Sequence, residues 1–204
     1  MKDSDSEQVR IGPMEPGDIY EALAIQAQAY PAWLREDAAV FAARLALPQP
    51  FSLTARRAGA MVGYLLAHGW KRANPPAIGT LTGPAGASDL LYIHDLAIAP
   101  HARGLRLGER LVARAFDAAR ASGLGEAELV AVEGAHSFWH RLGFCEGHSP
   151  AIAAKLASYG ADARWMWLEG LGPGRGLRAK QPRSASRAAT TPASAFAACP
   201  WSRR

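Results

Sequence analysis

The sequence predicts one α/β domain followed by a segment that cannot fold by itself. The chain has 204 residues, and 49% of them are hydrophobic, enough for the core of one domain. Stretches with strand composition and stretches with helical spacing alternate over residues 9–170. From residue 171 the chain is rich in Gly, Pro, Arg, Ser, Ala and Thr, without hydrophobic periodicity. We therefore expect a flexible N-terminus (1–8), a folded domain (9–170) and a disordered basic tail (171–204).

The N-terminal part of the domain predicts a strand, two helices and a hairpin. Residues 9–14 have strand composition, and a helix is predicted over residues 18–30, starting with a capping box formed by Asp18 and Glu21. A second helix is predicted over residues 34–46. Gly59 separates two further strands, 51–57 and 61–69, and supplies the turn of a hairpin. The Pro- and Gly-rich residues 71–89 predict a long loop, which in a compact domain is often functional or mobile.

The second part predicts a strand–turn–helix unit and its continuation. The apolar strand that begins at Leu90 ends at Pro100, and a helix is expected to start near Gly104. Ser122-Gly123 ends this helix. A strand at 126–132, a short helix at 135–142 and a last strand at 163–169 complete the domain.

The net charge of +5 belongs to the tail. Seven basic residues and no acidic one follow residue 170, which leaves 16 basic and 18 acidic residues in the rest of the chain. Nucleic-acid binding needs a basic face or stripe, so the sequence argues against it for the folded domain. Whether the tail is a functional tether stays open.

The sequence also argues against a membrane protein, a secreted protein and a metalloprotein. No apolar run is long enough to span a bilayer, and the N-terminus is polar and acidic. Cys145 and Cys199 lack the neighbours of a zinc site, so we expect no metal. A cytoplasmic protein is the expectation.

The segment from His101 to Gly108 predicts a binding site for a pyrophosphate. It joins a buried strand to a helix, and the first amides of a helix have no partner within it. These amides and the helix dipole attract anions, and glycines let a phosphate approach the backbone. Arg103 adds a charged donor at the entry.

The segment resembles the acetyl-CoA signature of the GNAT superfamily of N-acetyltransferases. Arg103-Gly104-Leu105-Arg106-Leu107-Gly108 matches its first and last positions, whereas Arg106 stands where the family usually has glycine. The strand at residues 95–100 resembles the one that precedes this loop, and residues 135–144, ending in Gly143-Phe144, resemble the second hallmark of the family. The resemblance covers about residues 9–169.

The resemblance implies a single domain with a mixed sheet whose central parallel strands splay apart near Ile98 and Val130. Pantetheine would pair with the backbone of one of these strands, and an amine would attack the thioester directly. The implied acetyl-CoA contacts are Leu96, Ala97, Ile98, Arg103, Gly104, Leu105, Arg106, Leu107, Gly108, Phe138 and Trp139. The guanidinium of Arg106 would lie either along a phosphate or in solvent, with its backbone helical. A homodimer is compatible with the family, although no residue argues for one.

The candidates for moving the amine proton are His94, Asp95, Glu133 and His136. Because alternate side chains of a strand face opposite sides, only one of His94 and Asp95 should face the acceptor. Asp95 also has a structural interpretation, as an acceptor of backbone hydrogen bonds. Trp139 occupies the position of the tyrosine that serves as general acid in many relatives, and is either a wall of the pocket or part of the core. Five other aromatic side chains either line the acceptor pocket or pack in the core: Tyr20, Tyr30, Trp33, Trp70 and Tyr92. The C-terminal region often closes the acceptor side in the family, so Tyr159, Gly160, Trp165 and Trp167 could select the substrate.

Two functions from different classes follow. The first is an N-acetyltransferase that acetylates a primary amine of an unidentified acceptor. The second is a non-catalytic CoA-binding domain that works as a sensor or interaction module, which the residues Arg106 and Trp139 would favour.

Overall fold

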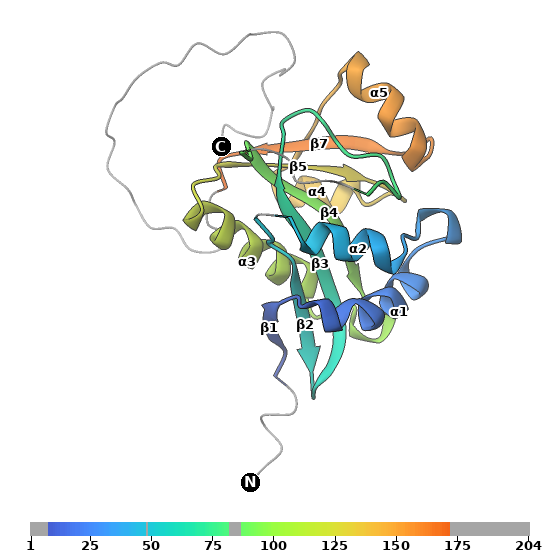
Figure 1. Ribbon diagram of the computed structural model, residues 1–204, viewed down its shortest axis with the longest axis vertical. Helices are drawn as coiled ribbons and strands as arrows, with labels where there is room; N and C mark the ends of the chain where they lie inside the picture. Colours follow the sequence, from blue (N-terminus) through green and yellow to red (C-terminus); the bar gives the residue numbers. More distant parts are fainter. Residues whose placement is uncertain (1–7, 48, 82–86, 172–204) are drawn as a thin grey trace.

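The computed structural model describes residues 8–47, 49–81 and 87–171. Seven strands form one sheet in the order β1-β2-β3-β4-β5-β7-β6, with a single parallel pair, β4 and β5 (Figure 1). This confirms the predicted α/β fold with a mixed sheet. The strands are β1 (Arg10–Pro13), β2 (Leu53–Arg57), β3 (Ala60–Trp70), β4 (Leu90–Ile98), β5 (Glu126–Ala131), β6 (Cys145–Glu146) and β7 (Arg164–Glu169). The helices are α1 (Ile19–Ala29), α2 (Ala38–Leu45), α3 (Leu107–Ala121), α4 (His136–Arg141) and α5 (Pro150–Leu156).

Helices cover both faces of the sheet and bury two separate apolar clusters. On one face α1 and α2 pack against Tyr64 and Leu66 of β3. On the other face Leu111 and Phe116 of α3 join the larger cluster, which includes Leu65 of β3. Successive side chains of β3 thus belong to clusters on opposite faces of the sheet, as the two-residue period of a strand requires.

The hairpin between β2 and β3 has the predicted turn. Arg57 pairs with Ala60, and the two residues between them, Ala58 and Gly59, have φ values of 50° and 84°. Two consecutive left-handed residues form the turn that matches the twist of a hairpin, and Gly59 adopts this conformation without a steric cost.

The predicted capping box of the first helix is wrong. A 3₁₀ turn, Pro16–Asp18, precedes α1, and the reciprocal capping bonds join Glu15 and Asp18. Asp18 and Glu21 instead both bind Arg56, with the nearest oxygens at 2.7 Å. Proline at the first position of the turn starts the helical backbone one turn earlier than the capping pattern suggested.

The second helix also starts later than predicted. Residues 32–34 form a 3₁₀ turn, and α2 begins at Ala38 after Asp37, whose side chain accepts a hydrogen bond from Val40 N at 3.0 Å. The apolar spacing of this region runs through both elements, which hides the break between them.

The central strands part in the middle of the sheet, which confirms the predicted splay. The register of β4 and β5 ends with the pair Ile93 and Leu129. Beyond that pair β5 continues beside β7, while β4 stays with β3. Leu66 of β3 pairs with Asp95 of β4, and the next β3 residue, Ala67, pairs with Ile93. His94 lies between these two β4 residues and is therefore the extra residue of a β-bulge.

The C-terminal part contains elements without a sequence signal. β6 has two residues and α5 has seven, too few for a readable period. Leu171, expected to open the tail, is only 3% exposed, and its amide donates to Gly125 O at 3.0 Å. The predicted flexible and disordered segments, 1–8 and 171–204, otherwise lie outside the described residues, apart from Gln8.

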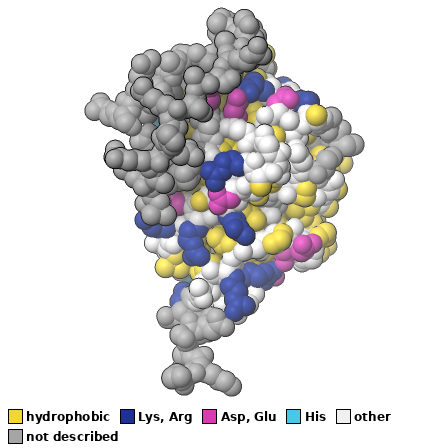
Figure 2. Space-filling model, turned by 90° about the vertical axis from the view of Figure 1, so that its left-hand side faces the viewer, with side chains coloured by type: hydrophobic (Ala, Val, Ile, Leu, Met, Phe, Trp, Pro, Cys, Tyr) yellow, Lys and Arg dark blue, Asp and Glu magenta, His cyan; other side chains and the backbone are white. Residues whose placement is uncertain are grey.

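The described part of the chain contains no helix that is long and apolar enough to cross a membrane. Within the same residues, no three His, Cys, Asp or Glu side chains gather as metal ligands would. Figure 2 shows one face of the molecule, where the basic side chains stand in separate groups among acidic, apolar and uncharged ones.

Candidate functional site

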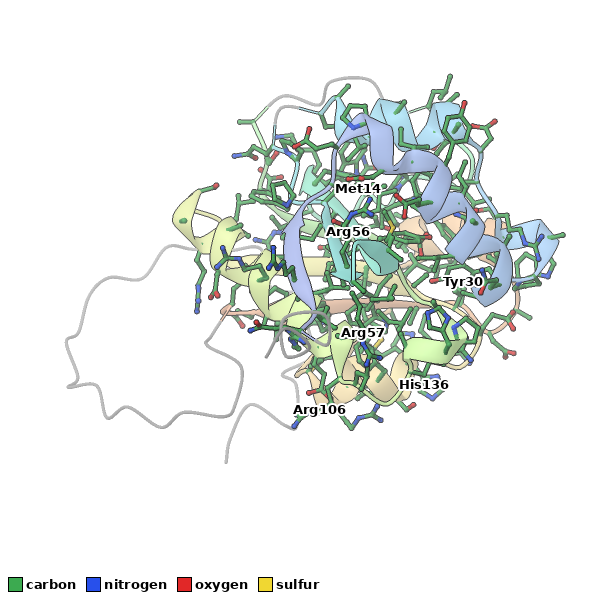
Figure 3. All side chains as sticks on the ribbon, turned by 90° about the horizontal axis from the view of Figure 1, so that it is seen from below. Met14, Tyr30, Arg56, Arg57, Arg106 and His136 are labelled. Carbon is green, nitrogen blue, oxygen red and sulfur yellow. The ribbon has the colours of Figure 1, made fainter. Side chains whose placement is uncertain are left out.

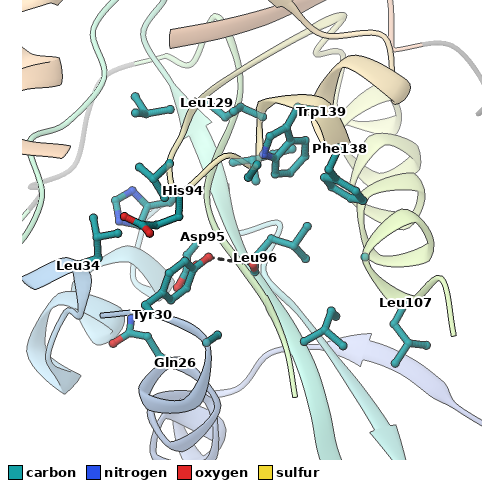
Figure 4. Close-up of a pocket in the computed structure, with 18 of the residues that line it drawn as sticks. Gln26, Tyr30, Leu34, His94, Asp95, Leu96, Leu107, Leu129, Phe138 and Trp139 are labelled. Carbon is teal, nitrogen blue, oxygen red and sulfur yellow. Dashed lines mark hydrogen bonds between the residues drawn. The ribbon is translucent and has the colours of Figure 1, made fainter. Parts of the chain in front are cut away.

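A cavity of about 480 Å³ lies where β4 and β5 part. Its walls come from the end of α1, the segment that follows it, β4, β5, the start of α3 and α4 (Figure 4). The start of α3 forms one end of the cavity, and the side chains of His94 and Leu34 lie at the opposite end. The cavity therefore runs from a helix N-terminus to a cluster of buried polar groups.

The first end is built by the turn between β4 and α3. Arg103 is extended, Gly104 has φ of 85°, and the helix begins at Leu107. Its first backbone hydrogen bond is from Arg110 N to Arg106 O at 3.2 Å. The amides of the first turn, those of Leu107 to Glu109, therefore lack intrahelical acceptors and carry the positive end of the helix dipole.

Gly108 lets α3 approach α4 closely. A Cβ atom at this position would lie 3.2 Å from Cζ of Phe138 and 3.6 Å from Cδ2 of Leu96. Both neighbours line the cavity, so any side chain at position 108 would press on its walls. The close approach of Phe138 thus explains why glycine suits the last position of the signature in this chain.

Arg106 departs from the sequence prediction. Its backbone is left-handed, with φ 55° and ψ 27°, whereas a helical backbone was expected, and the helix starts one residue later. Its Nε lies 2.9 Å from Glu109 Oε2, and the side chain is 78% exposed at the periphery in Figure 3. Of the two predicted arrangements, the structure shows the solvent-exposed guanidinium.

The strand β4 offers alternate residues to the gap. Ala99 N donates to Val62 O, so Ala97 and Ala99 turn their peptide groups toward β3, while Leu96 and Ile98 turn theirs toward the gap. Leu96 O accepts a hydrogen bond from the hydroxyl of Tyr30 at 2.9 Å, dashed in Figure 4. Ala97, expected to bind pantetheine with its neighbours, is buried beside β3 and does not line the cavity.

The other predicted cofactor residues fall into two groups. Leu105 is 45% exposed and does not line the cavity. The structure brings the remaining ones together around the cavity: Leu96, Ile98, Arg103, Gly104, Arg106, Leu107, Gly108, Phe138 and Trp139.

His94 belongs to a buried ion-pair network. Its Nε2 lies 2.7 Å from Oε2 of Glu36, and the two side chains are 3% and 4% exposed. The other oxygen of Glu36 accepts from Arg44 at 3.1 Å and from the amide of Gly79 at 2.7 Å. Burial raises the pKa of Glu36, but its interactions with His94, Arg44 and the Gly79 amide outweigh burial and lower the pKa to about 2. Glu36 is therefore ionised, and His94 Nε2 carries a proton.

Asp95 lies beside His94 on the same side of the strand. Both residues line the cavity, although only one was expected to do so, because the bulge at His94 breaks the alternation of side chains. The Asp95 carboxylate accepts a hydrogen bond from the hydroxyl of Tyr64, where backbone donors were expected. Burial and the charge of Asp95 raise the pKa values of Tyr30 and Tyr64 well above their usual range.

Glu133 and Trp139 line the cavity from the β5 side. Glu133 is exposed and left-handed, with φ of 48°, in the turn between β5 and α4. Trp139 is 6% exposed and stacks edge-on against Phe138 and Phe144. It is therefore both a wall of the cavity and part of the larger apolar cluster, so both predicted interpretations of Trp139 apply.

Of the aromatic candidates for the acceptor side, Tyr30 and Tyr159 line the cavity, whereas Trp165 and Trp167 do not. Tyr20 is 79% exposed, and Tyr92 and Trp70 are buried in a small separate cluster. Trp33 is 53% exposed and covers Gly160, where a Cβ would lie 2.8 Å from its ring.

Sequence reasoning missed Glu36 and Arg44. Glu36 lies in a short irregular segment without a pattern. Arg44 carried one signal, because it occupies an apolar position of the predicted second helix, and a buried arginine requires an anion.

Solved structures share this arrangement of sheet and helices. Ard1 from Thermoplasma volcanium is 17% identical, with a TM-score of 0.62, covering 80% of this chain and 99% of that chain. Naa50 from Arabidopsis thaliana, in complex with the bisubstrate analogue CoA-Ac-MVNAL, is 16% identical, with a TM-score of 0.57 and coverages of 79% and 98%. A putative streptothricin acetyltransferase from Bacillus anthracis, in complex with acetyl-CoA, is 16% identical, with a TM-score of 0.55 and coverages of 80% and 98%.

The solved structures establish the fold at these low identities, and no curated protein sequence matches this chain. The family itself follows from the sequence: a model described as the acetyltransferase (GNAT) family matches residues 19–144, from α1 to the Gly143-Phe144 hallmark. This match spans more than half of the chain, and it shows that the chain belongs to the GNAT acetyltransferase family.

Proposed function

We propose that this chain is an enzyme that transfers an acetyl group from acetyl-CoA directly to a primary amine. One observation carries the proposal: a single cavity joins the unpaired amides at the start of α3 to the polar side chains of His94 and Asp95 on β4. The first end suits a diphosphate, and the second suits an amine that must lose a proton.

The residues at the start of α3 fit the diphosphate of acetyl-CoA. Backbone amides, the helix dipole and Arg103 all favour an anion, and Gly104 and Gly108 keep the approach to the backbone open. The peptide groups of Leu96 and Ile98 face the gap between the strands, where they can pair with the amides of an extended ligand. When bound, acetyl-CoA would supply an activated thioester.

The polar cluster on β4 handles the proton of the amine. An ammonium has no free electron pair, so it must lose a proton before it forms a bond to the acetyl carbon. Asp95 lines the cavity and can accept this proton directly or through one water molecule. His94 is a weaker candidate, because its Nε2 is held by Glu36 and its Nδ1 is buried.

The leaving group needs little help from the protein. Trp139 stands in the position of the usual proton donor, and an indole N–H is not acidic. A thiol with a pKa of about 8.5 can depart as the thiolate near neutral pH. The tryptophan instead closes the cavity wall.

Calorimetric titration with acetyl-CoA tests the proposal, with Gly108→Trp and Gly17→Trp as matched variants. Gly17 lies outside the cavity, and a Cβ there would meet nothing within 4 Å. We expect micromolar binding by the wild type and by Gly17→Trp, and at least tenfold weaker binding by Gly108→Trp. Absence of binding in the wild type would refute the proposal. Binding without acetylation of any amine would instead support a CoA-binding module without catalysis.

A further inference from the structure

The two ends of the cavity differ in the charge of their side chains. Among the described residues that line it, the arginines are Arg103 and Arg106, and both belong to the turn before α3. The opposite end, near Leu34 and His94 in Figure 4, carries the carboxylates of Glu36 and Asp95. The end that would receive the acceptor is therefore the acidic one.

The two carboxylates at this end are not equivalent. Glu36 is compensated by the buried guanidinium of Arg44, and its oxygens also accept from His94 and the Gly79 amide. Asp95 accepts from the neutral hydroxyl of Tyr64, and no ion pair joins it to a Lys or Arg among the described residues. Asp95 is therefore the carboxylate at this end of the cavity that lacks an ion pair with a Lys or Arg among the described residues.

Apart from His94 and the amide of Gln26, which accepts from the Glu36 N–H, the other side chains named at this end are apolar or aromatic. Leu34 and Ile78 line the cavity together with the rings of Tyr30 and Tyr159. Tyr159 is held in place because its hydroxyl donates to Pro76 O at 2.5 Å. Such a site suits a cation that is attached to an apolar body.

Resting on the proposed function, we infer that the acceptor is a small primary amine with an apolar body and no carboxylate next to the amino group. The ammonium is attracted to Asp95, which then accepts its proton. An α-amino acid would bring its carboxylate close to Asp95, at the end of the cavity that has no lining arginine or lysine among the described residues. Repulsion between like charges and the loss of hydration would exclude it.

Pairs of acceptors that differ only in the carboxylate test this inference. The pairs are phenethylamine and phenylalanine, tyramine and tyrosine, and histamine and histidine, with phenylalaninamide as an uncharged analogue. We would measure kcat/KM for acetyl transfer, and binding of the same compounds to the CoA-saturated protein by calorimetry. We expect at least one pair in which the amine exceeds the amino acid by at least tenfold, with phenylalaninamide grouped with the amines.

The outcomes separate this inference from the proposed function. If no pair shows this preference for the amine, the inference is overturned and acetyl transfer is left intact. Failure of every amine to bind the CoA-saturated protein also overturns it, whereas failure of acetyl-CoA itself to bind overturns the proposed function.

Two charge variants, Ile78→Arg and Asp95→Asn, and one uncharged control show whether charge sets the preference. Ile78→Arg places a cation at the acidic end, and Ile78→Gln is its uncharged control at a half-buried position. We expect the ratio of amine to amino acid to fall at least threefold with arginine and to stay unchanged with glutamine. Asp95→Asn should lower the same ratio; the ratio is the readout because this substitution also lowers activity. Unchanged ratios in both charge variants would refute the inference.

Discussion

At the scale of single residues, Glu36 organises the candidate site. Its two oxygens join three separate parts of the chain: His94 on β4, Arg44 on α2 and the amide of Gly79 in the loop after β3. Its own amide donates to the side chain of Gln26 at 3.0 Å. A buried carboxylate with this many donors is stabilised as an anion, and it holds both the proton on His94 Nε2 and the position of the loop.

Replacing Glu36 with glutamine should therefore destabilise the protein strongly. The buried Arg44, which is 0% exposed, would lose its anion, and breaking a buried pair costs about 3–5 kcal/mol. Glu21→Gln is the control, because Glu21 pairs with Arg56 at the surface and is 48% exposed, where such a pair contributes about 1 kcal/mol or less. Urea unfolding of both variants measures the difference. Equal losses in the two variants would contradict the role assigned to Glu36.

At the scale of elements, the β-bulge in β4 and the start of α3 shape the cavity. The bulge turns His94 and Asp95 to the same side, and the early end of the β4–β5 ladder opens the gap beneath them. The turn before α3 needs two left-handed residues, Gly104 and Arg106. A non-glycine residue in this conformation carries strain of about 1–2 kcal/mol.

Arg106→Gly should stabilise the protein relative to Arg106→Ala by about 1 kcal/mol, because alanine keeps the strain and glycine removes it. Neither substitution should weaken acetyl-CoA binding more than about threefold, since the guanidinium contacts Glu109 and is largely exposed. Thermal unfolding and calorimetry provide the two measurements. A tenfold loss of affinity in both variants would show that the guanidinium turns toward the phosphates when the ligand binds.

At the scale of the whole molecule, a second buried carboxylate connects the C-terminal strands to the loop after β3. Glu128 of β5 is 1% exposed, accepts from the Ala73 amide at 3.0 Å and from the indole of Trp165 on β7 at 3.2 Å. Burial raises the pKa of Glu128 to about 7, against the smaller opposing effect of these hydrogen bonds.

This carboxyl should make the stability of the fold depend on pH. Its folded pKa of about 7 exceeds the ordinary value of 4.5, so folding favours the protonated form. The stabilisation is fully present below pH 4.5 and is lost as the pH rises through about 7. We expect the free energy of unfolding to fall between about pH 5 and about pH 8, by up to about 1.4 kcal/mol per unit, and Glu128→Gln to flatten this slope. Glu169→Gln, at an exposed position, is the control; parallel slopes in all three proteins would refute the prediction.

Apart from β6 and α5, the succession of strands and helices along the chain and the place of the anion-binding turn can be predicted from the sequence. These features depend on local patterns: the apolar strand before Pro100, the stripe of α3 and the glycines at 104 and 108. The sequence also indicated the family, through motifs that lie within a few residues of each other.

Only the tertiary structure decided which polar side chains meet. Gly79 follows Glu36 by 43 residues and His94 follows it by 58, and no local pattern connects the three. The placement of Asp95 depended on one unpaired residue in a β-ladder, which reverses the face of every side chain after it. Secondary structure follows from neighbours in the sequence, whereas the charge and the partners of a buried site follow from packing between distant segments.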